Sequence, residues 1–175
     1  ELAAALSARA APGQRPTDLD RGRPGFPGDD PAHVLAAQVD ASEGSLHVYH
    51  LVSALAAGLD CSAEVLCGGV KRLARTVFKT AVKYACDFAL CRDMVRCTVV
   101  VEDLPGAAAV LGAVLGSGDF AVVRLKNRFD PEYDAVPIGG YRDFQLLCLV
   151  EDPATPGTWR YCELQINLHR MVQIK

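Results

Sequence analysis

The sequence predicts an α/β (α+β) domain with a mixed, mostly antiparallel sheet of four to five strands and flanking helices. Runs rich in β-branched and aromatic residues indicate strands, and apolar residues three and four apart indicate helices. Only the first predicted strand is followed by a crossover helix, so the other strands are expected to pair antiparallel. The chain has 175 residues, 50% hydrophobic and 22% charged, as in soluble globular proteins. A net charge of −3 excludes a whole-molecule attraction to nucleic acid or anionic membranes.

The first part of the chain differs in composition from the rest. Residues 1–31 are expected to be an extended low-complexity tail, because five prolines and few large apolar residues follow position 11. Residues 2–17 are rich in alanine and lack acids, which fits either an organelle transit-peptide remnant or an ordinary flexible tail. Because the chain begins at Glu1, we expect a processed or truncated form. Protein partners are expected to order this tail, and no segment has the ~18–20 apolar residues of a membrane span.

Residues 32–63 are expected to hold N-terminal helices, and residues 64–175 the main domain. Two short helices are predicted, His33–Val39 and Leu46–Leu59, separated at Ser42, Glu43 and Gly44. His47 and His50 share a helical face, so they either fill space or bind a metal.

A longer helix is predicted at about Val70–Ala89. One of its faces carries an apolar stripe that is expected to face the core, and another face carries cations four residues apart. This second face is either a solvated basic surface or a binding surface for a polyphosphate. The apolar stripe comprises Leu73, Val77, Ala81, Tyr84 and Phe88, and the cations are Lys71, Arg75, Lys79 and Lys83.

The remainder is predicted to be mainly strands. A strand at Met94–Glu102 precedes a helix that Asp103 caps and that ends at Gly116, with Pro105 in its first turn. The connection 127–140 is long enough for a functional or mobile loop, and 151–158 resembles a hairpin turn. The other predicted strands are Phe120–Lys126, Arg142–Val150 and Trp159–Leu168.

Strand alternation indicates where chemistry could occur. In the last strand Tyr161, Glu163, Gln165 and Asn167 share one face, and Arg124 and Lys126 share a face of another strand. Asp93 precedes the first predicted strand. Two carboxylates, Asp93 and Glu163, with nearby cations suit a magnesium-bound nucleoside triphosphate. The alternative is that Glu163 simply pairs with Arg124 or Lys126 on an exposed face.

Five segments in order resemble the motifs of RelA/SpoT synthetase domains. They are GGVKRLARTVFKTAVKY, RDMVRCTVVV, VVRLKNRF, GGYRDFQL and YCELQINLHRM, within residues 68–171. The family patterns are a G-R-x-K-S helix start, D-x-x-G-x-R, R-x-K-D, N-G-Y-x-S-L-H and E-V-Q-I-R-T-x-x-M. The resemblance implies a nucleotidyltransferase-like fold, with a further helix expected beyond Lys175.

The resemblance also implies roles for matching residues. Lys71 and Lys79 would bind phosphate, with Arg75 beside them, and Arg124 and Lys126 would be the cationic pair. Tyr141 would stack on guanine. Asp93 and Glu163 would hold Mg²⁺, Glu163 would also activate the acceptor 3′-hydroxyl, and Gln165 would lie beside it. The implied reaction is pyrophosphate transfer from ATP to GDP or GTP.

The chain departs from these motifs at several positions, so it resembles a divergent branch. Three functions therefore remain open: a nucleotide pyrophosphokinase, a catalytically silent domain that acts as a structural or interaction subunit, and another nucleotidyl transfer. In a silent subunit an acidic partner or RNA would cover the cations. Gly69, Arg96, Thr98, Gly139, Gln145 and Asn167 stand where the family has other residues.

Seven cysteines without a C-x-x-C pair argue against a disulfide framework and a zinc site. Several lie in apolar runs, where a thiol behaves as a small buried hydrophobe. We therefore expect a reducing intracellular compartment, either cytoplasm or an organelle matrix or stroma.

Overall fold

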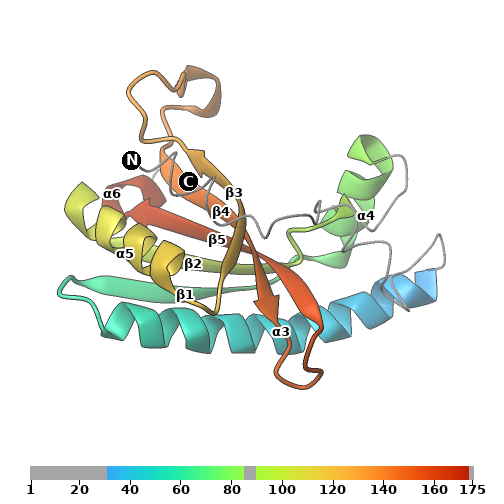
Figure 1. Cartoon of the computed structure of the whole chain (residues 1–175). Helices are drawn as coiled ribbons and strands as arrows, with labels where there is room; N and C mark the ends of the chain where they lie inside the picture. The colour runs from blue at the N-terminus through green and yellow to red at the C-terminus, as the bar shows by residue number, and fades with distance from the viewer. Residues whose placement is uncertain (1–30, 85–89, 174–175) are drawn as a thin grey trace.

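A five-stranded sheet forms the centre of the molecule. The structure is a computed structural model that describes residues 31–84 and 90–173. The strand order is β1-β2-β5-β4-β3, and only the β2–β5 pair is parallel (Figure 1). The predicted mixed, mostly antiparallel fold is therefore confirmed, while residues 1–30, Cys86 and Phe88 lie outside the described residues. The strands are β1 (Ala63–Val70), β2 (Val95–Val101), β3 (Ala121–Asn127), β4 (Asp143–Glu151) and β5 (Trp159–Leu168).

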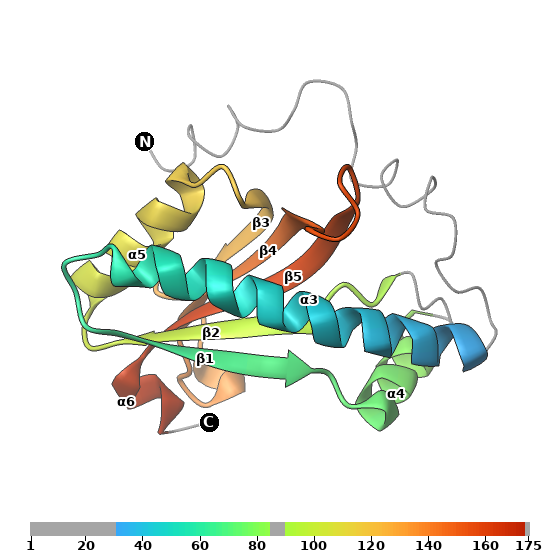
Figure 2. The same cartoon turned by 90° about the horizontal axis from the view of Figure 1, so that it is seen from below.

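Two helices, α3 (Pro31–Ala57) and α5 (Leu104–Gly116), cover one face of this sheet (Figure 2). The prediction of two short helices before the sheet was wrong, because α3 continues through Gly44. Gly44 lies against the Arg160 side chain, and a Cβ there would be 3.2 Å from Arg160 Cδ. The glycine therefore permits close packing and does not end the helix.

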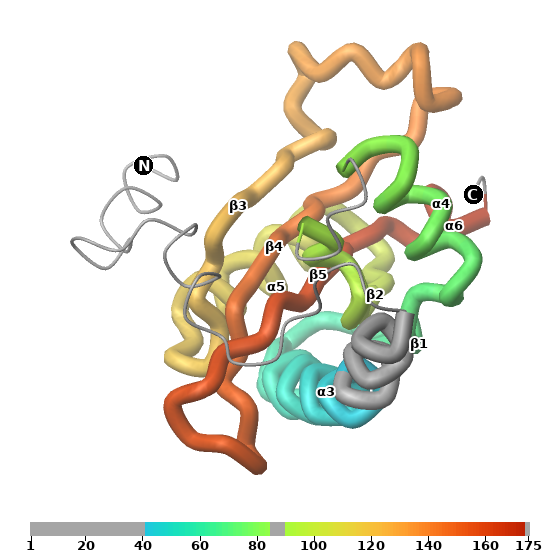
Figure 3. The backbone as a smooth tube through the Cα atoms, turned by 90° about the vertical axis from the view of Figure 1, so that its right-hand side faces the viewer, coloured from blue at the N-terminus to red at the C-terminus, as the bar shows by residue number. Residues whose placement is uncertain are grey.

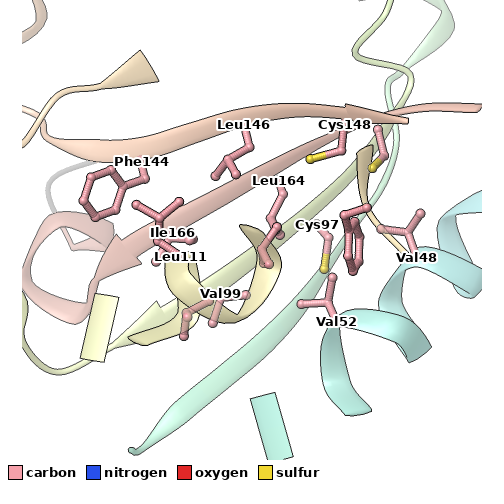
Figure 4. Close-up of a cluster of buried hydrophobic side chains, with 14 of the residues drawn as sticks. Val48, Val52, Cys97, Val99, Leu111, Phe144, Leu146, Cys148, Leu164 and Ile166 are labelled. Carbon is pink, nitrogen blue, oxygen red and sulfur yellow. The ribbon is translucent and has the colours of Figure 1, made fainter. Parts of the chain in front are cut away.

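The core lies between these helices and the sheet (Figure 4). The even-numbered residues of β4 and β5 face it, so Cys162, Leu164 and Ile166 are fully buried. The helices contribute Val48 and Val52 from α3 and apolar residues of α5. Four of the six described cysteines are buried, as expected for core thiols. Burial raises the pKa of Cys97 to about 12.

Strand β1 was missed by the sequence analysis. Its two glycines weaken the strand pattern, yet it pairs antiparallel with β2 and has a bulge between Cys67 and Val70. Gly69 has a φ of 59° there, which favours glycine. A Cβ on Gly68 would lie 2.8 Å from the Arg96 carbonyl oxygen, so this bulge also requires a glycine at 68.

Helix α4 (Leu73–Lys83) is shorter than predicted, and the prediction of its core-facing stripe was wrong. Leu73 and Val77 are exposed, whereas Thr76 and Thr80 face inward and are buried. Their hydroxyls donate to carbonyls one turn earlier in the helix, so their burial leaves no unsatisfied group. The helix packs through this narrow threonine face, and most of its apolar side chains remain at the surface.

Two further predictions of local structure agree with the structure, the cap of α5 and a connection between β3 and β4 without a strand. The Asp103 side chain accepts a hydrogen bond from Gly106 N at 2.8 Å and caps α5, as expected. The loop between β3 and β4 contains a short 3-10 helix, η2 (Val136–Ile138), and α6 (His169–Val172) follows β5. In the described ranges, no helix is both long and apolar enough to cross a membrane.

Candidate functional site

The second face of the sheet is the candidate site, because it carries polar side chains and is not covered by α3 or α5. Helix α4 and the β3–β4 loop both stand on this side, away from the middle of α3 (Figures 1 and 3). The register aligns one residue from each of four strands in a row. This row, called here the central row, is Arg96, Glu163, Leu147 and Arg124.

The central row places Glu163 between two arginines. Arg96 lies on the adjacent strand, about 4.8 Å away between backbones, and Arg124 lies two strands away beyond Leu147. Glu163 forms no ion pair with Arg124 or Lys126 in the described part of the chain, so the simple pairing alternative does not hold. The predicted shared face of Arg124 and Lys126 is confirmed, because they pair with Leu147 and Gln145, which lie two residues apart on β4.

A second row lies one pleat further along and contains Thr98, Gln165, Gln145 and Lys126. Gln165 Nε2 donates to Glu163 Oε1 at 2.7 Å, which orients that carboxylate. The second oxygen, Glu163 Oε2, has no hydrogen bond to any described residue. One oxygen of Glu163 is thus held and the other remains available on a half-buried, polar surface.

Asp93 lies just before β2 and binds two lysines. Lys71 Nζ and Lys79 Nζ each donate to Asp93 Oδ2 at 2.6 Å. Lys71 directly follows β1 and its backbone N–H donates to Met94 O, whereas Lys79 projects from α4. The structure therefore joins three predicted site residues in one cluster, called here the Asp93 cluster. Arg75 and Lys83 are exposed and lie outside it.

The electrostatics of the Asp93 cluster favour ionised groups. Burial alone raises the pKa of Asp93, but hydrogen bonds and charges from Lys71 and Lys79 outweigh it and lower the pKa to about 2. Burial lowers the pKa of Lys79, and the bond to Asp93 outweighs this effect and raises it. Burial and the nearby Asp93 raise the pKa of the Cys91 thiol.

This lowered pKa makes stability depend on pH. The pKa of Asp93 is 3.8 when unperturbed and about 2 in the folded protein. Its contribution to the free energy of unfolding is therefore complete above pH 4 and is lost as pH falls through 2. The contribution is ~2 kcal/mol. We expect Asp93→Asn to lose this amount at pH 7 in urea unfolding and to show a flatter stability profile between pH 4 and pH 2. Parallel profiles for both proteins would contradict the coupling.

The register places Asp93 and Glu163 at the same end of the parallel strand pair. Val95, the first residue of β2, pairs with Cys162, and the next pair is Arg96 with Glu163. Asp93 is only two residues before this pairing begins, so its backbone lies within ~7 Å of Val95. The Asp93 cluster therefore flanks the central row.

Tyr141 lies at the other end of the open face in a polar network that sequence analysis missed. Its hydroxyl lies 3.1 Å from Asp143 Oδ2 and 2.5 Å from Asn167 Oδ1. Arg128 Nη1 donates to Asp143 Oδ1, and Arg128 Nη2 donates to Gln145 Oε1 at 3.3 Å. Burial and the charge of Asp143 raise the pKa of Tyr141. This network fixes the position of the tyrosine.

The β3–β4 loop is held by Arg142. Its guanidinium donates to the carbonyl oxygens of Arg128, Asp130 and Tyr133 at 2.8, 2.7 and 3.2 Å. Asp130 and Asp134 also accept bonds from backbone N–H groups two residues ahead. The predicted functional or mobile loop thus has many internal bonds, and it rises from the sheet on the side away from α3 (Figure 1).

The donor set at this end fits magnesium. Carboxylate oxygens are its preferred ligands, and a low pKa keeps Asp93 ionised at neutral pH. Glu163 Oε2 is available, and Asp93 Oδ1 contacts only the Cys91 thiol at 3.4 Å among described residues. No group of three His, Cys, Asp or Glu suited to a metal occurs in residues 31–84 and 90–173. His47 and His50 are on α3, where His50 contacts the Tyr49 ring.

Comparisons with known proteins identify the fold. No family model matches the chain, and no curated protein sequence matches it. Among solved structures, it resembles small alarmone synthetase 1 from Bacillus subtilis with a TM-score of 0.60 and 16% identity, over 77% of this chain and 70% of that one. It also resembles small alarmone synthetase 2 from the same organism, with a TM-score of 0.60 and 17% identity, over 79% of this chain and 72% of that one. A third similar structure is the complex between the Type VI effector Tas1 and its immunity protein. The TM-score is 0.60 and the identity 19%, over 82% of this chain and 65% of that one.

Proposed function

Because the chain has the fold of RelA/SpoT-like (p)ppGpp synthetases, we propose that it is a divergent purine-nucleotide-binding domain that transfers pyrophosphate from ATP to GDP or GTP. The observation that carries the proposal is the alignment of Glu163 with two arginines beside the Asp93 cluster. This arrangement offers cations for phosphates and an oxygen that can accept a proton. One solved relative of the same fold holds its product pppGpp.

In the proposed reaction the 3′-oxygen of the guanosine nucleotide attacks the β-phosphorus of ATP. A bond forms between these atoms, the bond from the β-phosphorus to the bridging α,β-oxygen breaks, and AMP leaves with the bonding electrons. The hydroxyl proton passes to the carboxylate of Glu163, which the hydrogen bond from Gln165 holds in place. Magnesium, held by Asp93 and Glu163, would neutralise phosphate charge.

Other residues would bind and orient the substrates. Lys71, Lys79 and Arg75 would bind phosphates at the Asp93 end, and Arg124 and Lys126 would bind them from β3. Tyr141 would stack on guanine, and its hydroxyl bonds to Asn167 and Asp143 would set the ring direction. Orientation of this kind lowers the entropy loss in the transition state.

The direct test is nucleotide turnover. With Mg²⁺, ATP and GDP, the protein is expected to release AMP and to form a guanosine nucleotide with an added 3′-pyrophosphate. The matched control replaces GDP with its 3′-deoxy form, which lacks the attacking oxygen and should stop AMP release. Equal AMP release with both acceptors would indicate ATP hydrolysis and overturn the proposed transfer, as would no release with GDP.

The surface of α4 favours a second function, in which the domain is a silent subunit of an assembly. Phe78 and Val82 are 69% and 71% exposed, and Leu73 and Val77 are also exposed on this helix. Helix α4 contains cations and no acidic residue. Apolar surface among cations suits a partner with an acidic rim. RNA contact is the other way to cover these cations.

The exposed α4 surface gives a stability prediction. Phe78→Ser combined with Val82→Ser is expected to change the free energy of unfolding by less than ~1 kcal/mol, because these side chains contact mainly solvent. Urea unfolding measures this, and solubility should rise. A loss above ~2 kcal/mol would show that both side chains pack within the domain and would remove the argument for a partner.

A further inference from the structure

Arg96 is a cation on the open face for which the sequence motifs assign no role. It lies on β2 opposite Glu163, and it is half-buried. Its Nε is buried and has no hydrogen-bond partner. The structure gives the Arg96 guanidinium no hydrogen bond, ion pair or ring contact with any described residue.

The β1 bulge makes room for this arginine. Gly68 faces Arg96 across the β1–β2 pair, and an added Cβ would lie 2.8 Å from Arg96 O and 3.0 Å from Arg96 Cβ. Real Cβ atoms do not approach so closely, so a larger residue at 68 would displace Arg96. Gly68 thus allows Arg96 to occupy its position on the open face.

A purely structural role does not explain Arg96. If Arg96 served as the counter-ion of Glu163, the two would form an ion pair across adjacent strands, and they form none. Glu163 accepts its hydrogen bond from Gln165 instead. Arginine carries five N–H donors, and a half-buried guanidinium without an acceptor loses solvation and gains no bond in return. An anionic ligand would supply the missing acceptors.

We propose that Arg96 binds the polyphosphate chain of a nucleoside triphosphate. The inference deepens the proposed function and rests on it, because it uses the same face of the sheet. Lys71 and Lys79 are both bonded to Asp93, whereas Arg96 must break no ion pair to reach a phosphate. The planar guanidinium can donate two parallel bonds to phosphate oxygens. It would hold the phosphates beside Glu163, where the attack occurs.

The test measures binding of three probes with Mg²⁺ by calorimetry: ATP, AMP and inorganic tripolyphosphate. Arg96→Gln is expected to lower the affinity for ATP and for tripolyphosphate by about tenfold or more. The affinity for AMP should fall by less than about twofold. Arg96→Lys should recover only part of the affinity, since it keeps the charge and loses the paired geometry. Arg170→Gln, an equal charge change on exposed α6, should leave all three affinities unchanged.

Each outcome decides a separate point. Tripolyphosphate binding that depends on Arg96, in a protein that releases no AMP with GDP, would support the role of Arg96 and overturn the proposed transfer. Unchanged ATP affinity in Arg96→Gln would overturn the role of Arg96 alone, and so would an equal loss for AMP and ATP. No binding of ATP or tripolyphosphate by the natural chain would overturn both. Thermal unfolding of each variant separates lost binding from lost folding.

Discussion

Glu163→Gln is expected to lower AMP release by about 10²–10⁴-fold. Glutamine keeps the shape of the side chain but cannot accept the proton of the 3′-hydroxyl, and it removes one negative charge from the metal site. Since Glu163 makes one hydrogen bond to Gln165 and no ion pair among described residues, its replacement should leave the fold intact. The measurement is single-turnover AMP release with Mg²⁺, ATP and GDP.

The control for this variant is Glu102→Gln, an equal charge change on an exposed side chain just after β2, at the far end from Glu163. It should retain the natural rate. Both variants should keep the thermal midpoint of the natural protein within a few degrees. An undiminished rate in Glu163→Gln would remove Glu163 from the reaction and leave the fold assignment unaffected.

Asp143→Ala is expected to lower the free energy of unfolding by ~3 kcal/mol. Asp143 is fully buried and accepts bonds from Arg128 and from the Tyr141 hydroxyl. Without the carboxylate, Arg128, whose side chain is only 15% exposed, loses its ion pair. Burial of an uncompensated charge causes the loss, which urea unfolding at pH 7 measures directly.

Two further variants test this explanation. Adding Arg128→Met to Asp143→Ala should recover part of the loss, because it removes the unpaired charge. Glu132→Ala, on an exposed residue of the same loop, should change stability by less than ~0.5 kcal/mol. If Asp143→Ala alone cost less than ~1 kcal/mol, the network around Tyr141 would not be the main support of this end of the sheet.

The strands predicted correctly are those in which local pattern and burial agree. Trp159–Leu168 alternates polar and apolar residues, and that alternation separates the open face from the core. Strand β1 was missed because Gly68 and Gly69 are not typical strand residues. They form a bulge that is explained only by the pairing of β1 with β2. Gly44 led to the opposite error. In the sequence it indicates the end of a helix, whereas in the structure it lies inside α3 and packs closely against Arg160.

The prediction that the apolar stripe of α4 faces the core was wrong for a related reason. Helical periodicity identifies an apolar face but not what lies opposite it. Here the threonine face is the buried one. Thr76 Oγ1 lies 3.5 Å from Met94 Sδ, just before β2, and Lys79 on the same side of the helix reaches Asp93. The sequence could suggest Lys79 and Asp93 as site residues, but only the folded chain brings them together.

The network residues Arg128, Asp143 and Asn167 could not be found from spacing alone. They come from three segments of the chain and meet only through the β3–β4–β5 register. Arg96 was recognised as a departure from the motif, and its place opposite Glu163 depends on the β2–β5 register. Long-range register therefore determines most of the site, whereas local pattern determines most of the strands.

The proposed function requires Asp93 and Glu163 to act in one nucleotide site. The most direct measurement is a crystal structure with Mg²⁺ and a non-hydrolysable ATP analogue. We predict one Mg²⁺ with an oxygen of Asp93 and an oxygen of Glu163 both at ~2.1 Å, with Lys71 and Lys79 turned from Asp93 to the phosphates. A nucleotide bound elsewhere, or a metal held by only one of these carboxylates, would contradict it.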